Sequence, residues 1–72
     1  MKFLVVTKTY DKYQLKCETE LNVVPAVDTY IEIGDSIYRV VAVIHRSMKP
    51  SVLVVESVNH SMFISKIKDI LP

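Results

Sequence analysis

The sequence predicts an α+β domain, mostly β, in which five antiparallel strands form a small barrel or a strongly curved sheet and a helix follows at the C-terminus. Three observations lead to this prediction. Several segments are rich in β-branched and aromatic residues, some of them alternate between apolar and polar side chains, and only the C-terminal tail shows helical spacing. No repeat, low-complexity tract or linker divides residues 1–72, so we expect a single domain.

The first two strands are predicted to form a hairpin. β-branched and aromatic residues favour a strand over residues 2–9, and Asp11 with Lys12 supplies a polar turn. Over residues 13–24, apolar and polar side chains alternate as in a strand with one buried and one solvated face. The buried set of this strand is predicted to be Tyr13, Leu15, Cys17, Thr19, Leu21 and Val23.

The middle of the chain is predicted to be a second hairpin. Pro25 has no N–H to donate and therefore ends the preceding strand. A strand over residues 29–33 runs into Gly34 and Asp35, where the chain's single glycine can adopt the positive φ of a two-residue turn. The next strand, residues 37–46, is apolar on both faces. Its core-facing set is predicted to be Tyr38, Val40, Ala42 and Ile44, opposite Leu15 and Leu21.

The last strand is predicted over residues 51–58, after a loop at residues 47–50. The apolar residues that follow recur at helical spacing, and Pro72 cannot continue a helix, so a helix is predicted over residues 61–71. These apolar residues are Met62, Phe63, Ile67, Ile70 and Leu71.

The composition excludes several classes of protein. Nine Lys and Arg residues balance eight Asp and Glu residues, so the net charge of +1 points to no strongly anionic partner. The only cysteine is Cys17, so an internal disulfide is excluded. The apolar run at the N-terminus is too short for a signal peptide or a membrane span. We therefore expect a cytoplasmic protein without a membrane partner.

Few residues suggest a catalytic or metal-binding role. Cys17 could act as a nucleophile with His45 or His60 as its base, but its place on the buried face of an alternating strand favours packing. The carboxylates of Asp28, Glu32 and Asp35 could hold a cation or act as an acid–base pair, but two of the three fall at predicted turns and match no metal motif. We expect no enzyme activity, no catalytic residue, no metal and no cofactor.

A binding function remains. Tyrosine supplies contact area and a hydrogen bond at low entropic cost, and the loop at residues 47–50 is polar and turn-like. The residues predicted to bind a partner protein are Tyr10, Tyr13, Tyr30, Arg46, Met48 and Lys49. One alternative is a barrel that binds nucleic acid, with the cations Arg46, Lys49, Lys66 and Lys68. Another alternative is a sponge for a small signalling nucleotide, which only scattered arginines and tyrosines support.

A homo-oligomer is also predicted. A small monomeric sheet usually leaves one face solvated, yet residues 37–44 are apolar on both faces. A helix of three turns, about 16 Å long, covers only two or three strands. The residues predicted to lie at the contact between chains are Val41, Val43, Phe63 and Ile67.

The middle of the chain resembles small bacteriophage and mobile-element proteins whose pattern is shared by SH3-like barrels. The residues that carry the resemblance are Pro25, Val27, Asp28, Thr29, Ile31, Ile33, Gly34, Tyr38, Arg39, Val40, Val43 and His45. Where that pattern has a glycine before the first aspartate, this chain has Val27, which puts the shape of the first turn in doubt. The resemblance implies a strongly bent sheet or a partly open barrel, and an accessory or inhibitor protein that binds a bacterial host protein without catalysis.

Overall fold

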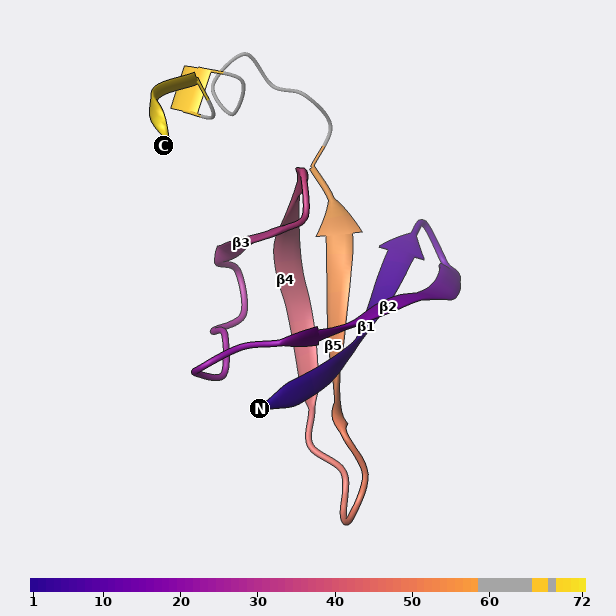
Figure 1. The fold of residues 1–72 in the computed structure, drawn as a ribbon. Helices are drawn as coiled ribbons and strands as arrows, with labels where there is room; N and C mark the ends of the chain where they lie inside the picture. Colours follow the sequence, from indigo (N-terminus) through magenta and orange to yellow (C-terminus); the bar gives the residue numbers. More distant parts are fainter. Residues whose placement is uncertain (59–65, 68) are drawn as a thin grey trace.

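The structure is a computed structural model that describes residues 1–58, 66–67 and 69–72. Its five strands form one sheet and confirm a mostly-β fold (Figure 1). The strands are β1 (Lys2–Thr9), β2 (Lys12–Glu20), β3 (Tyr30–Ile33), β4 (Ser36–Ile44) and β5 (Ser51–Ser57). The helix predicted over residues 61–71 falls mostly on residues outside this description, so it stays a prediction.

The order of the strands corrects two expectations. The sheet runs β2-β1-β5-β4-β3, and β1 pairs with β5 in parallel, so the sheet is mixed rather than antiparallel. β2 and β3 are edge strands that do not pair with each other, so the sheet does not close into a barrel. The apolar runs FLVV in β1 and VLVV in β5 are typical of central strands whose two faces are both covered.

A strand ends where the neighbouring strand offers no more backbone to pair with. β1 begins at Lys2 and β2 ends at Glu20, its partner in the register, although the alternating pattern predicted a strand to residue 24. Beyond this register Met1 and Leu21 exchange two bonds: the Leu21 N–H donates to the Met1 carbonyl oxygen, and the N-terminal ammonium donates to the Leu21 carbonyl oxygen, both at 2.9 Å. β4 similarly ends at Ile44, beside the start of β5, and not at residue 46. An alternating pattern therefore extends beyond the strand where no neighbouring backbone is left to pair.

A β-bulge in β4 explains why this strand is apolar on both faces. Val40 pairs with Val55 and Ala42 pairs with Val54, so Val41 is an extra residue. The bulge reverses the alternation. Tyr38 and Val40 are buried as predicted, but beyond the bulge Val43 packs against the core and Ile44 is 49% exposed. The predicted core position of Ile44 is therefore wrong, and Val43 does not belong to a second stripe facing away from the core.

A second bulge divides the predicted buried face of β2. Cys17 pairs with Val5 and Leu15 pairs with Val6, so Lys16 is the extra residue. Cys17 packs against the core, whereas Leu15, on the other side of the bulge, is 62% exposed. The expectation that Leu15 faces the core is therefore wrong, because strict alternation holds only in a strand without a bulge.

The core lies on one side of the bent sheet. β1 lies beside β5, and β2 runs across the view of β5 and β4 in Figure 1; Leu21, which follows β2, packs against the same cluster as residues from β3. We call this side the core face; its fully or largely buried side chains are Phe3, Val5, Tyr38, Val40, Leu53 and Val55. The opposite side, the outer face, carries the alternate residues of the same strands, including Leu4, Val6, Arg39, Val52, Val54 and Glu56.

Candidate functional site

The structure separates the predicted contact residues into two groups at opposite ends of the sheet. The β1–β2 turn, with Tyr10, lies at the end where β5 finishes, because β1 and β5 are parallel. The loop between β4 and β5 precedes Ser51, at the other end of β5 (Figure 1). Seven strand residues separate these ends, which corresponds to about 23 Å. The tyrosines and the predicted loop residues therefore cannot form one contiguous surface.

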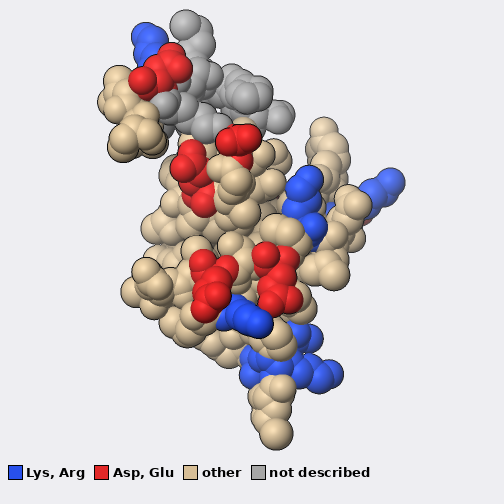
Figure 2. Space-filling view, in the orientation of Figure 1, with Lys and Arg blue, Asp and Glu red and all other residues tan. Residues whose placement is uncertain are grey.

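The first group is the β4–β5 loop, residues 45–50. Arg46 Nε donates a hydrogen bond of 2.7 Å to the carbonyl oxygen of Pro50, which closes the loop across its base. Met48, at the apex, has a left-handed φ of 60° and is fully exposed. Figure 2 shows Lys and Arg side chains gathered at the end of the molecule where Figure 1 places this loop. Because no Asp or Glu occurs in residues 36–55, the loop's Arg46 and Lys49 have no acidic neighbour in that segment.

The cations expected for nucleic-acid binding are not all gathered there. Arg46 and Lys49 share the β4–β5 loop. Lys66 belongs to the segment after β5, which leaves the sheet at the opposite end (Figure 1). Lys68 lies outside the described residues. The basic surface that sequence reasoning assembled from four side chains therefore rests on two of them.

The second group belongs to a row of polar side chains that crosses the outer face. The register places neighbouring strands' residues side by side: Tyr30 with Arg39, Arg39 with Glu56, and Lys8 with Tyr13. β1 and β5 complete the row, because Thr7 pairs with Val55 and the next residues along these parallel strands are Lys8 and Glu56. We call this set the charged row; its members are Tyr30, Arg39, Glu56, Lys8 and Tyr13.

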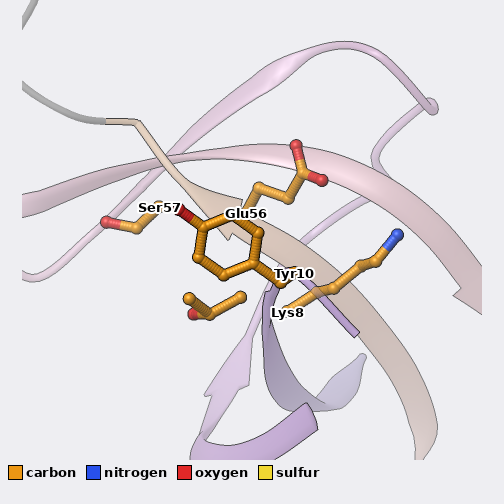
Figure 3. Close-up of a pocket in the computed structure, with 5 residues that line it drawn as sticks. Lys8, Tyr10, Glu56 and Ser57 are labelled. Atoms are coloured by element: carbon orange, nitrogen blue, oxygen red, sulfur yellow. The ribbon is translucent and has the colours of Figure 1, made fainter. Parts of the chain in front are cut away.

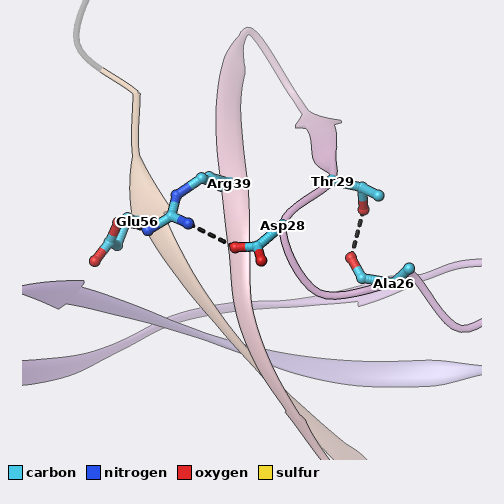
Figure 4. Close-up of polar contacts among 5 residues, drawn as sticks. All are labelled: Ala26, Asp28, Thr29, Arg39 and Glu56. Atoms are coloured by element: carbon cyan, nitrogen blue, oxygen red, sulfur yellow. Dashed lines mark hydrogen bonds and ion pairs between the residues drawn. The ribbon is translucent and has the colours of Figure 1, made fainter.

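Within the charged row, Arg39 bonds two carboxylates (Figure 4). Its Nη1 donates to Asp28 Oδ1 at 2.7 Å and its Nη2 donates to Glu56 Oε2 at 2.6 Å. The hydrogen bond from Arg39 lowers the pKa of Glu56 below its ordinary value, and the nearby charge of Lys8 acts in the same direction. The same bond raises the pKa of Arg39. Glu56 is therefore ionised at neutral pH and does not have the raised pKa of a general acid.

Asp28 reaches Arg39 because the connection from β2 to β3 is held against β4. The Asp28 N–H donates to the carbonyl oxygen of Val40 at 2.9 Å, and the Val40 N–H donates to that of Thr29 at 2.9 Å. Asp28 has a φ of 67°, a left-handed conformation that aspartate tolerates better than most residues. The Thr29 hydroxyl donates to the carbonyl oxygen of Ala26 within the same turn (Figure 4). Asp28 thus shapes the turn after Pro25, as predicted.

An open hollow lies where the charged row meets the β1–β2 turn (Figure 3). Its volume is about 600 Å³, and its lining comprises Lys8, Thr9, Tyr10, Glu56 and Ser57. The hollow therefore combines one phenol ring, one cation, one carboxylate and two aliphatic hydroxyl groups. Composition and motif gave no signal for it, because its residues come from the ends of two strands that are neighbours only in the folded sheet.

The remaining predicted sites are placed as follows. Cys17 is partly buried against the core, and His45 is exposed in the β4–β5 loop; His60 lies outside the described residues. Of the predicted oligomer contacts, Val41 and Ile67 are partly buried, Val43 packs on the core and Phe63 is not described. Within residues 1–58, 66–67 and 69–72, no three His, Cys, Asp or Glu side chains are grouped to hold a metal ion.

Two further findings concern more than the site itself. In the described part of the chain, no helix has the length and apolarity needed to cross a bilayer. Comparison with protein-family models, curated proteins and solved structures finds no match to this chain.

Proposed function

We propose that this protein acts by binding another protein, without catalysis of its own, and that the β4–β5 loop is the contact element. The observation that carries the proposal is Met48, a fully exposed apolar side chain at the apex of a loop. The hydrogen bond from Arg46 to the carbonyl oxygen of Pro50 closes the base of the loop that presents Met48. An apolar anchor on a preorganised loop loses little entropy on binding.

The chemistry of the loop defines the partner. Arg46 and Lys49 flank Met48, so the complementary surface is an apolar pocket bordered by carboxylates. The resemblance to phage and mobile-element proteins supports an accessory or inhibitor role on a bacterial host protein, in the cytoplasm of that host. The loop reaches away from the sheet, so a partner can contact it without disturbing the core.

A pull-down that compares matched variants tests this proposal. The tagged chain, the double variant Met48→Asp/Lys49→Glu and the control Lys12→Glu are each exposed to bacterial lysate, and bound proteins are quantified by mass spectrometry. Lys12 is an exposed cation in β2, at the other end of the sheet, so the control changes charge without touching the loop. We expect one protein that the unmodified chain and the control retain and the loop variant loses.

Two outcomes would contradict the proposal. One is the same set of bound proteins for the loop variant as for the unmodified chain. The other is loss of the bound material on nuclease treatment, with a steep dependence on salt, which would identify a nucleic acid as the partner. Circular dichroism of all three chains checks that the substitutions, which are at exposed positions, leave the fold intact.

A further inference from the structure

Tyr10 has a strained backbone that packing does not explain. The residue lies in the two-residue turn between β1 and β2 and has a φ of 58°. Glycine, asparagine and aspartate enter this left-handed region readily, whereas a bulky aromatic residue there is an outlier. The side chain is 90% exposed, so burial of the ring does not compensate for the strain. A two-residue hairpin turn calls for a positive φ at its first position, as Gly34 shows in the β3–β4 hairpin, and this turn leaves the Tyr10 ring on the surface beside Lys8 and Ser57.

The hollow beside Tyr10 is open to solvent and is lined mainly by polar residues. Its volume of about 600 Å³ lies in the range of small-molecule sites. Apart from the Tyr10 ring, its lining is polar, and Lys8 and Ser57 supply hydrogen-bond donors. Glu56 supplies an acceptor, and its bond to Arg39 keeps the carboxylate ionised and in place. Figure 3 shows these side chains around the hollow, with the Tyr10 ring among them.

The charges of the lining select the class of ligand. Lys8 contributes +1 and Glu56 contributes −1, so the lining has no net charge. An isolated phosphate would meet the Glu56 carboxylate as well as the Lys8 ammonium, which disfavours it. A purely apolar ring would make no use of the Lys8 ammonium or of the Glu56 oxygen that Arg39 does not bond. A flat ring with donors and acceptors on its edge, and no large charge of its own, satisfies both the aromatic face and the polar groups.

We propose that this hollow binds a nucleobase, stacked on the Tyr10 ring with its polar edge toward Lys8, Glu56 and Ser57. The β1–β2 turn places Tyr10 in the lining of the hollow. The site is independent of the β4–β5 loop, which lies at the other end of β5. An experiment can therefore disprove binding at the hollow without disproving the proposed contact with a protein, and the reverse also holds.

The base can come from a free nucleoside or from a single strand of nucleic acid, and the two sources differ in what else they touch. Tyr13 lies directly opposite Lys8 in the register and is exposed, so a strand could stack a second base there. We expect a strand to bind more tightly than a nucleoside, with a salt dependence from its phosphates, only if that second stack forms. Equal affinities for both probes would identify the free nucleoside as the ligand.

The test is a titration of the full chain with adenosine and with single-stranded deoxyadenosine decamer, followed by two-dimensional NMR. We expect shifts confined to Lys8, Tyr10, Glu56 and Ser57 and their neighbours. Tyr10→Ala should weaken binding roughly 5-fold to 150-fold, the change that corresponds to loss of one base–aromatic stack. Tyr10→Phe keeps the ring and should stay within about twofold of the unmodified affinity, since stacking requires only the aromatic face.

Tyr10→Gly separates binding from folding. Glycine adopts a positive φ without strain, so this variant should melt at a higher temperature than the unmodified chain and yet lose the ligand. Tyr30→Ala is the matched control, because it removes another exposed tyrosine of the charged row, on β3, and should leave affinity unchanged. The proposal is overturned if neither probe shifts Tyr10, if Tyr10→Gly binds as well as the unmodified chain, or if Tyr30→Ala weakens binding equally.

Discussion

At the scale of single residues, Arg39 links three segments of the fold through its two ion pairs. Its guanidinium connects β4 to Glu56 of β5 and to Asp28 of the connection before β3. Arginine suits this position because its planar fork presents several donors in a rigid arrangement. Both carboxylates are substantially exposed, so we treat the group as a means of positioning the connection rather than as a major source of stability.

The ion pair predicts an acid-dependent part of the stability. Glu56 has a pKa below its ordinary value of 4.5 in the folded chain, so the unfolded chain binds a proton before the folded chain does. The contribution is fully present above pH 4.5 and is lost as the pH falls through the lower, folded value. Urea denaturation measures the free energy of unfolding at pH 7 and at pH 3. The decrease between these two pH values should be smaller for Glu56→Gln than for the unmodified chain. Equal losses would mean that the pair does not stabilise the fold.

Val43 and Ile44 provide a test of the bulge in β4. Val43→Lys places a charge against the core and should lower the free energy of unfolding by about 2 kcal/mol or more. Ile44→Lys changes a half-exposed residue on the outer face and should cost less than about 1 kcal/mol. Chemical denaturation of both variants measures the difference. If Ile44→Lys proved the more costly, the alternation would continue through Val41 without a bulge.

At the scale of elements, turns and bulges decide which side chains meet. The β3–β4 hairpin has the two-residue turn that the sequence predicted, with Gly34 at a φ of 61°. Gly34 is a local feature that a short stretch of sequence specifies. The bulges at Lys16 and Val41 are different, because each exists only relative to the strand beside it. This is why the turn was predicted correctly and the faces of β2 and β4 were not.

Gly34 predicts a stability change that depends on backbone conformation alone. No atom outside its immediate chain neighbours lies within 4 Å of where a Cβ would stand, so added volume is tolerated. Gly34→Ala should nevertheless lower the free energy of unfolding by about 1 kcal/mol, because alanine is strained at this positive φ. Gly34→Asn should lower it less, since asparagine enters the left-handed region more easily. Thermal melts monitored by circular dichroism compare the two; equal effects would contradict this explanation.

At the scale of the whole molecule, the outer face has exposed apolar margins. Its central side chains on β1 and β5 are partly or largely buried, but Leu15 on β2 and Ile44 on β4 are well exposed. A domain of 72 residues buries a smaller share of its surface than a larger domain does, so apolar area left in water is costly. We still expect an oligomer. We now place the contact between chains on the outer face, and no longer on the stripe that includes Val43.

Light scattering on a sizing column tests this expectation. The unmodified chain should show a mass above that of one chain at micromolar concentration, because association removes the exposed margins of the outer face from water. Leu15→Lys should lower that mass and leave the β spectrum unchanged, since Leu15 is not part of the core. Lys12→Glu, on the same strand, is the control and should have no effect. A monomeric mass for the unmodified chain would contradict the expectation.

The sequence by itself determined the number of strands, their approximate ranges and the β3–β4 turn. Alternation, β-branched residues and a glycine act over a few neighbouring residues, so a reader of the sequence can use them directly. The continuous apolar runs of β1 and β5 also carried the signal that these strands are central, although the prediction did not use it.

Only the tertiary structure decided the parallel pairing of β1 with β5, the open edges, the two bulges and the charged row. Each of these depends on which backbone lies beside which, and the hydrogen bonds that select a neighbour join residues far apart in the chain. Arg39, Glu56 and Lys8 show this most clearly, because three different strands bring them side by side. A pattern within one strand contains no information about the residue that stands opposite it in the sheet.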